Sequence, residues 1–446
     1  SARLTMTAST HGVSVSSAFD AGNIELVEQK GGVVGLRIKS DPYTELEKKH
    51  HMQWFALRAT SAGEQPAAPT KYEILNAGDV SFAGAWEGSE VVASVDRQTW
   101  TRVESTTYDK ARKALCWEWT HTADAPSVFF AYFDLYSYER QLDLVARCAA
   151  ATGAPGLRVG SLGQSLDGRE MDVVTVGTGK LHAWVIHRQH PGESQAAFFA
   201  EGLLGRLLGL ETGGSVDGLT QQLLRDFTWH VVPNMNPDGA TRGYLRTNAG
   251  GANLNREWAP TGDYDAPTLA RSPEVHHTLA AMDATGVDLF IDVHGDEALP
   301  FAFLAGSEGL PVWSARLKSL HGAFLGAFCR ANPDMNKRFG YEPDAPQQAN
   351  LAICSNQVGQ RFDCLSATLE MPFKDNANNP RRPGTSRGYD GRRCASLGAS
   401  LLDAAAHVRA SLRGDDEPSF PSPDDAYVTP VEDDAAIAEF LAAAKH

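Results

Sequence analysis

The sequence predicts two domains: an all-β antiparallel sandwich, followed by an α/β domain whose mixed, largely parallel sheet is covered by helices on both faces. The first observation is length, because 446 residues exceed the roughly 100–200 expected of one domain. The second is that short β-type runs fill the first third of the chain. The third is that apolar strand-like runs then alternate with helical stretches. The expected parts are 1–134 for the sandwich, 135–413 for the α/β domain and 414–446 for an acidic, Pro-rich linker with a short terminal helix.

The sandwich is expected to contain six short runs with period-two alternation, as in Trp54, Ala56 and Arg58. Turn residues separate the runs at short spacing, which is typical of antiparallel strands in a sandwich. The runs are GNIELVEQ, GVVGLRIKS, HMQWFALRAT, KYEILNA, ALCWEWTHT and SVFFAYFDLY. From Tyr138 onward, YERQLDLVARCAAA carries apolar residues at helical spacing, so the domain junction is expected at residues 134–140.

The second domain is expected to alternate strands with helices. The strand-like runs are LHAWVIH, FTWHVVP, DLFIDVH and SATLEM, and the helical stretches include QAAFFAEGLLGRLLGL and EVHHTLAAMDATG. Beyond them, GDDEPSFPSPDD has the polar, Pro-rich composition of a linker, and residues 432–444 can form a short helix.

Composition excludes several classes of function. A formal net charge of −15 opposes general affinity for nucleic acid or for an anionic membrane, since both reward a basic surface. No apolar run of 18 residues is present for a membrane span, and the opening SARLTMTAST lacks a secretory pattern. The six cysteines are scattered without a CxxC pair, which favours reduced thiols. We therefore expect a cytoplasmic protein that binds neither nucleic acid nor membrane.

Three side chains form a candidate metal site. His190 and Glu193 lie in a His-Pro-Gly-Glu turn between the strand-like run LHAWVIH and a long apolar helix. His294 ends the run DLFIDVH. In open α/β sheets the carboxyl ends of the strands form the ligand crevice. Two imidazoles and a carboxylate suit Zn²⁺, and three protein ligands with one open position are typical of a catalytic zinc site.

The stretch NPDGATRGYLRTNAGGANLNREW, residues 236–258, follows the run FTWHVVP. Together with HPGES, the strand-end histidine and a later glutamate, it resembles the zinc carboxypeptidase family (M14), and all the motifs occur in that family's order. The passages SAFDAGNIELVE, HHMQWFALRA and SLGQSLDGREMDVVTV are similar to the cytosolic carboxypeptidase branch, which carries an N-terminal β-sandwich. The resemblance covers roughly residues 18–400. It implies a metallocarboxypeptidase that acts on the C-termini of peptides or proteins with one zinc ion on His190, Glu193 and His294.

The resemblance also implies roles for four other residues. Glu370, in SATLEM, matches the catalytic general acid/base, and Arg246, in YLRTN, matches the arginine that polarises the scissile carbonyl. Asn255 and Arg256 match the pair that binds the terminal carboxylate of the substrate, for which a guanidinium is suited.

The sequence says less about which C-terminal residue the enzyme would prefer. The cytosolic branch includes enzymes that remove glutamate, which would require a cation in the side-chain pocket. Arg361 is the candidate substrate-binding residue, and Arg381 and Arg382 are alternatives, although each also fits a surface arginine. The acidic net charge would repel polyglutamate at long range. The mobile tyrosine of the classical members has no match in QQANLAICSNQ, and Tyr341 is the nearest candidate.

Several neighbouring residues are expected to be structural or solvent-exposed, namely His187, His276, His277, Arg242 and the sandwich pair His50 and His51. Two other functions remain open. One is an N-acyl amino acid deacylase of the aspartoacylase type, which has a similar zinc site. The other is a non-catalytic binding protein whose hydrolase site is vestigial.

Overall fold

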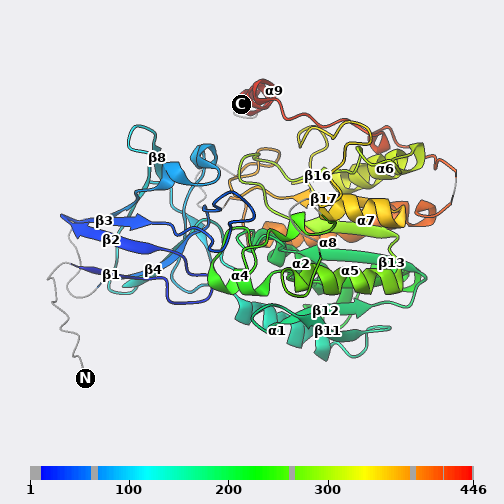
Figure 1. Ribbon diagram of the computed structural model, residues 1–446, viewed down its shortest axis with the longest axis horizontal. Helices are drawn as coiled ribbons and strands as arrows, with labels where there is room; N and C mark the ends of the chain where they lie inside the picture. The colour runs from blue at the N-terminus through cyan, green and yellow to red at the C-terminus, as the bar shows by residue number, and fades with distance from the viewer. Residues whose placement is uncertain (1–11, 62–68, 261–266, 382–387, 415, 444–446) are drawn as a thin grey trace.

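The computed structural model describes residues 12–61, 69–260, 267–381, 388–414 and 416–443. A β-rich N-terminal part lies beside a larger α/β part (Figure 1). The last strand of the first part ends at Ala131 and the first helix of the second begins at Tyr138. Among the described residues, no helix combines the length and the apolarity needed to cross a bilayer.

Two five-stranded sheets make up the N-terminal sandwich. One has the order β1 (Val13–Ser16), β4 (Ala56–Ser61), β10 (Ser127–Ala131), β6 (Val92–Ser94) and β7 (Thr101–Arg102). The other has the order β2 (Glu25–Lys30), β3 (Val33–Arg37), β5 (Thr70–Ile74), β9 (Ala114–Trp119) and β8 (Thr107–Asp109), and two 3-10 turns, η1 (Ala77–Asp79) and η2 (Ala83–Trp86), follow β5. Each of the six expected runs contains a strand.

The sandwich differs from the expected pattern at one pair, because β3 and β5 run parallel. The chain leaves β3 to form β4 in the other sheet before it returns as β5, so no hairpin joins the two strands. Aromatic side chains fill the space between the sheets: Trp117 stacks on Tyr72, with ring centroids 5.3 Å apart, and meets Phe130 edge-on. Such ring pairs stabilise the fold by more than the apolar area they bury would give.

A seven-stranded mixed sheet forms the centre of the α/β domain. Its order is β11 (Arg158–Gln164), β12 (Glu170–Val176), β14 (Phe227–Val232), β13 (Leu181–His187), β15 (Leu289–Val293), β17 (Leu365–Glu370) and β16 (Phe303–Ala305). The four strands β14, β13, β15 and β17 are parallel, and the flanking pairs are antiparallel. The central strands are buried on both faces, which explains why they read as continuous apolar runs.

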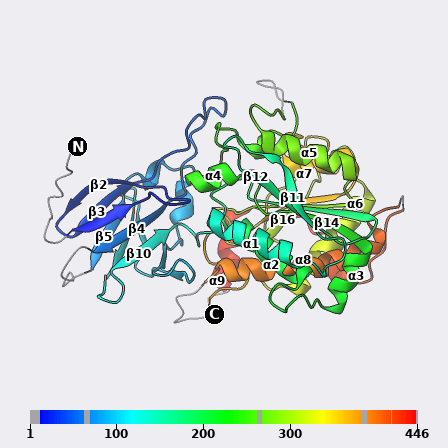
Figure 2. The same ribbon diagram turned by 90° about the horizontal axis from the view of Figure 1, so that it is seen from below.

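Helices cover both faces of this sheet (Figure 2). One layer holds α1 (Tyr138–Ala150), α2 (Gln195–Leu208), α3 (Gly218–Asp226), α6 (Ala315–Ala331) and α8 (Gly391–Val408), and the other holds α5 (Pro273–Thr285) and α7 (Cys354–Phe362). The shorter elements are α4 (Pro237–Arg242), η3 (Leu254–Arg256), η4 (Arg409–Ser411), η5 (Pro423–Asp425) and α9 (Asp434–Ala443). Helices α2 and α8 lie in close contact. The glycine at position 202 allows this approach, since a Cβ there would fall 1.8 Å from the backbone oxygen of Ala395.

The C-terminal segment is packed against the α/β domain, although its composition predicts a linker. Gly322 and Gly326 of α6 face its backbone so closely that a Cβ at either position would clash with residues 424–427. Asp425 is buried and accepts hydrogen bonds from Arg330 and His407. Charge pairing and two glycines on α6 therefore hold a segment that has few apolar residues of its own.

The parallel pairing of three central strands determines where the candidate site residues lie. Strands β13, β15 and β17 are neighbours and run in the same direction, so their carboxyl ends meet at one edge of the sheet. His190 follows β13 by three residues, His294 directly follows β15, and Glu370 is the last residue of β17.

Candidate metal centre and active site

His190, Glu193 and His294 meet at this edge of the sheet. His190 Nδ1 lies 2.7 Å from Glu193 Oε1, and His294 Nδ1 lies 2.8 Å from Glu193 Oε2. The two Nδ1 atoms are 3.1 Å apart. All three side chains are buried, and this is the one group in the described part of the chain whose ligand atoms could share a metal ion.

The turn that carries the first two ligands is held from both sides. Arg188 has a positive φ of 60°, and its buried guanidinium donates to the backbone oxygens of Pro191 and Tyr136. Gly192 donates its backbone N–H to Leu245, and a Cβ there would lie 3.0 Å from the same carbonyl oxygen. A glycine at this position therefore lets the 245–247 loop approach the ligand turn.

The outer ring nitrogens of both histidines have acceptors. His190 Nε2 donates to Asn253 Oδ1 at 3.0 Å, and His294 Nε2 donates to Asp292 Oδ2 at 2.9 Å. Because these bonds place the protons on Nε2, the lone pairs of Nδ1 face each other and Glu193. Such outer partners are a regular feature of metal-ligating histidines. Two Nδ1 atoms and a carboxylate in this arrangement fit a zinc ion.

Two of the three ligands, His190 and Glu193, carry the charge that metal binding requires, whereas Asp292 and Glu193 outweigh burial and raise the pKa of His294, so a metal ion would displace its proton. Burial, and then the charge of Arg246, lower the pKa of His190 to about 3, so this imidazole is neutral. Burial acts to raise the pKa of Glu193, but His190 and His294 together hold it below its usual value. A neutral imidazole and an ionised carboxylate are the protonation states that bind metal.

Glu370 lines the same cavity, which has a volume of about 360 Å³. The side chain is 7% exposed, and its Oε2 has no hydrogen-bond partner in the described part of the chain. Burial raises the pKa of Glu370 well above its usual range, and the charge of the neighbouring His294 acts to lower it. A carboxyl group with a raised pKa beside a candidate metal site can accept a proton and return it.

Three polar side chains from the 245–256 loop complete the cavity lining: Arg246, Asn255 and Arg256. Asn255 Oδ1 accepts the backbone N–H of Cys354 at the start of α7, and its Nδ2 lies 3.5 Å from His294 Nε2. Arg256 donates to the backbone oxygen of Asn255. The hydrogen bond to Asn255 Oδ1 thus fixes this stretch beside the metal group.

A residue of the N-terminal sandwich holds the same loop, and nothing in the sequence indicates it. The buried carboxylate of Asp41 accepts the backbone N–H groups of Leu245, Arg246 and Thr247, at 2.8 to 2.9 Å. Burial raises the pKa of Asp41, while the three backbone donors lower it. Asp41 stands in the unremarkable sequence DPYTE, and the contact spans more than 200 residues, so a motif search has no local pattern to find.

The predicted specificity residue Arg361 is not at the cavity. It lies at the end of α7 and forms an ion pair with Asp283 of α5, with Nε 2.6 Å from Oδ1. Ser355 and Asn356, at the opposite end of α7, are the residues that face the cavity. The prediction of Arg361 as a substrate-binding residue is therefore corrected, because the helix carries it away from the site.

The other candidates are placed as follows. Arg381 is paired with Glu90 of the sandwich, and Arg382 lies outside the described residues. Tyr341 does line the cavity and donates to Asp296 Oδ2 at 2.5 Å. As expected, His187 is buried against the backbone of Val232, His276 and His277 lie on α5, and Arg242 is paired with Asp167 on the surface.

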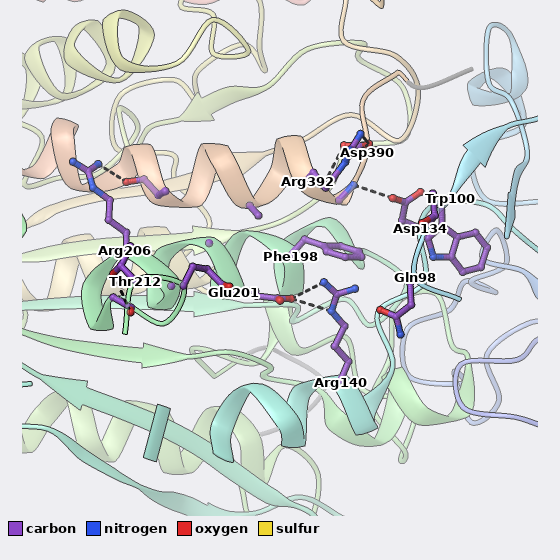
Figure 3. Close-up of a pocket in the computed structure, with 18 of the residues that line it drawn as sticks. Gln98, Trp100, Asp134, Arg140, Phe198, Glu201, Arg206, Thr212, Asp390 and Arg392 are labelled. Carbon is purple, nitrogen blue, oxygen red and sulfur yellow. Dashed lines mark hydrogen bonds and ion pairs between the residues drawn. The ribbon is translucent and has the colours of Figure 1, made fainter. Parts of the chain in front are cut away.

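A larger cavity of about 640 Å³ lies elsewhere, between α2, α8 and the sandwich segment that carries Trp100 (Figure 3). Its charged side chains largely pair with one another: Arg140 with Glu201, and Arg206 with Asp217. Arg140 also stacks over the ring of Phe198 at 4.7 Å. No histidine is among the described residues that line it, so volume alone does not mark the reactive site.

Comparison with known proteins agrees with the geometry. Residues 15–133 match the family model described as the cytosolic carboxypeptidase N-terminal domain, and residues 148–321 match the zinc carboxypeptidase model. An uncharacterised protein of Zymomonas mobilis is 41% identical over 88% of this chain and 96% of its own length. Mouse cytosolic carboxypeptidase 6 is 26% identical over 33% of this chain and 27% of its own length.

The solved structure of a metallo-carboxypeptidase from Pseudomonas aeruginosa is 39% identical over 90% of this chain and 100% of its own, with a TM-score of 0.80. The chain therefore belongs to the zinc carboxypeptidase family, as a metallocarboxypeptidase with a cytosolic carboxypeptidase N-terminal domain ahead of its catalytic domain.

Proposed function

We propose that this enzyme removes the C-terminal residue of peptides or proteins with one zinc ion on His190, Glu193 and His294. The observation that carries the proposal is the convergence on one cavity of the metal group, the buried Glu370 with a free oxygen, and the cations Arg246 and Arg256. These are the groups that peptide hydrolysis at a free C-terminus requires.

Each group has a separate task. A bound zinc ion supplies Lewis-acid chemistry. Glu370 takes a proton from the attacking water and passes it to the leaving amine, which a carboxyl group with a raised pKa does readily. Arg246 donates to the carbonyl oxygen as negative charge develops there. Asn255 and Arg256 bind the terminal carboxylate, so only chain ends fit.

The test is an assay of the zinc-loaded protein on blocked peptides, with detection of the released amino acid. A parallel assay uses N-acyl amino acids, the substrates of an aspartoacylase-type deacylase. We expect peptide hydrolysis and little deacylation. Deacylation without peptide hydrolysis would contradict the proposal, and failure to bind zinc would favour a non-catalytic binding protein.

A preference for glutamate stays a prediction, and it lacks a residue to support it. Arg361 and Arg381 are both committed to ion pairs away from the cavity. The Pseudomonas aeruginosa relative is described in complex with (2-guanidinoethylmercapto)succinic acid, which joins carboxyl groups to a guanidino group. That combination resembles a C-terminal arginine more than a C-terminal glutamate.

We also propose a cytoplasmic location. All six cysteines are free, and five of them are buried. Burial raises the pKa of Cys148 and Cys364 to about 12, so these thiols are unreactive. Unpaired structural thiols are usual in a reducing compartment.

A further inference from the structure

We propose that Glu308 selects a cationic terminal side chain, lysine or arginine, and that Tyr427 of the C-terminal segment positions its carboxylate. The inference rests on the carboxypeptidase function proposed above and names the substrate class of that same cavity. It starts from the distribution of charge among the described residues that line the cavity.

Carboxylates outnumber cations in this cavity. Apart from Glu193 and Glu370, five acidic residues line it, namely Asp296, Glu297, Glu308, Glu342 and Asp344. The cations in the lining are Arg246 and Arg256. Both are assigned to the scissile carbonyl and the terminal carboxylate, so a terminal glutamate side chain would meet no further cation among the described lining residues.

Two of the five acids are unsuited to bind a substrate cation. Both oxygens of Asp296 are occupied, one by the hydroxyl of Tyr341 and the other by backbone N–H groups at 298 and 299. Glu297 is buried, with 5% of its surface exposed, so it presents little surface to a substrate cation. Neither offers an accessible oxygen that is free to accept a new bond.

Glu342 and Asp344 are exposed, so solvent and salt screen their charge. Glu308 is half-buried, and its Oε1 accepts a hydrogen bond from Tyr427 at 2.9 Å. Its Oε2 makes no hydrogen bond or ion pair with the described part of the chain. Glu308 is therefore the partly buried carboxylate of the lining that keeps an oxygen available.

The wall beside Glu308 is small and polar. Ala305 of β16 pairs with Thr368 of β17, two residues before Glu370 and on the same side of the strand. Thr368 Oγ1 lies 2.9 Å from Ser355 Oγ at the start of α7. The Glu308 carboxylate lies directly over Gly306, where a Cβ would fall 2.6 Å from both of its oxygens.

This wall leaves room for the methylene stem of a lysine or arginine, with a single carboxylate for its charged end. Long basic side chains commonly bury the stem and pair the head in this way. A net charge of −15 also attracts cationic peptides at long range.

Tyr427 is fixed by the packing of the C-terminal segment on α6. A Cβ at Gly322 would lie 2.6 Å from the backbone nitrogen of Tyr427, and Lys318 Nζ lies 5.1 Å from the centre of its ring. Burial, and then Glu308, raise the pKa of Tyr427, so the hydroxyl remains a donor. Pro430 of the same segment also lines the cavity. The tail is thus part of the substrate site.

The test compares zinc-loaded, full-length enzyme on blocked dipeptides that differ only in their last residue: Lys, Arg, Phe or Glu. We expect kcat/KM to be highest for Lys and Arg and lowest for Glu. In Glu308→Gln the ratio of kcat/KM for Lys to that for Phe should fall about 10- to 100-fold, chiefly through KM. In Glu308→Lys the preference should shift toward Glu.

Tyr427→Phe should lower the same Lys-to-Phe ratio by less, about 3- to 10-fold, because it removes one hydrogen bond and leaves the charge. Glu25→Gln, on the exposed strand β2, removes the same net charge far from the cavity and should leave the ratio unchanged. These ratios are insensitive to a general loss of folded protein.

The outcomes separate the two proposals. If no terminal residue is released from any peptide, the carboxypeptidase function itself fails. If peptides are hydrolysed but Phe or Glu is preferred, or if Glu308→Gln leaves the Lys-to-Phe ratio unchanged, the role of Glu308 is wrong while the carboxypeptidase function stands.

Discussion

Single hydrogen bonds decide which ring nitrogen each histidine presents to the metal. Asp292 accepts from His294 Nε2, and the same oxygen accepts from Gln189 Nε2 at 2.6 Å. Asn253 does the same for His190. Both imidazoles are buried, so the outer acceptors rather than solvent set their tautomers.

Asp292→Asn tests this arrangement. The new amide can donate a hydrogen bond to Nε2, which would place the proton of His294 on Nδ1 and block the metal. We expect zinc affinity to fall about 10- to 100-fold, measured by competition with a chelator. Asp172→Asn, a half-buried carboxylate on β12, is the control. Equal zinc affinity in both variants would contradict the assignment of Nδ1 as ligand.

Glu370→Gln tests the general base. The amide keeps the shape of the side chain but cannot take a proton, so we expect kcat to fall at least about 10²- to 10⁴-fold. Zinc content should be unchanged because Glu370 is outside the ligand set. Steady-state kinetics and metal analysis measure the two effects. Turnover within tenfold of the parent would show that another group takes the proton.

At the scale of elements, the site is built where strand ends and loops from two domains meet. Strands β13, β15 and β17 bring the metal group and Glu370 to one edge of the sheet. The 245–256 loop adds the cations, and the sandwich holds that loop through Asp41. Gly251, with a φ of 81°, allows further close contact, since a Cβ there would lie 1.9 Å from the backbone oxygen of Tyr43.

Asp41→Ala tests whether the sandwich positions the loop. Three backbone N–H groups would lose their acceptor, and Arg246 would shift from the reacting carbonyl. Because misplacement of about 1 Å can cost about 100-fold, we expect kcat to fall about 10- to 100-fold with zinc content unchanged. The control is Asp124→Ala, on an exposed turn of the same domain. Parallel losses of zinc and of activity would indicate a wider structural role.

At the scale of the whole molecule, buried acids make stability depend on pH. Glu274, in the first turn of α5, has no exposed surface and accepts a hydrogen bond from Asn248. Burial raises the pKa of Glu274 to about 8 from an unfolded value of 4.5. Between these values the folded state retains a proton that the unfolded state has lost. Stability therefore falls as pH rises through this window.

Glu274→Gln removes this titration. Relative to the parent, the free energy of unfolding of the variant should rise from pH 5 to pH 8, by at most about 1.4 kcal/mol per pH unit. Denaturant unfolding at several pH values measures the difference. Glu139→Gln, an exposed first-turn acid of α1, should show no such trend. A difference that is constant with pH would mean that Glu274 is ionised in the folded protein.

The sequence by itself determined the two-domain order, the main strands and helices, and the residues that meet at the metal group. Periodicity reports which face of an element is buried, and parallel strands place their carboxyl ends together, so His190 and His294 could be read as candidates from local patterns, whereas Glu370 was indicated by the family resemblance. Only the tertiary structure decided the contact of Asp41 with the 245–247 loop, the pairing of Tyr427 with Glu308 and the displacement of Arg361. Those depend on contacts between segments as many as 200 residues apart, whose geometry is set by packing and leaves no periodic trace in the chain.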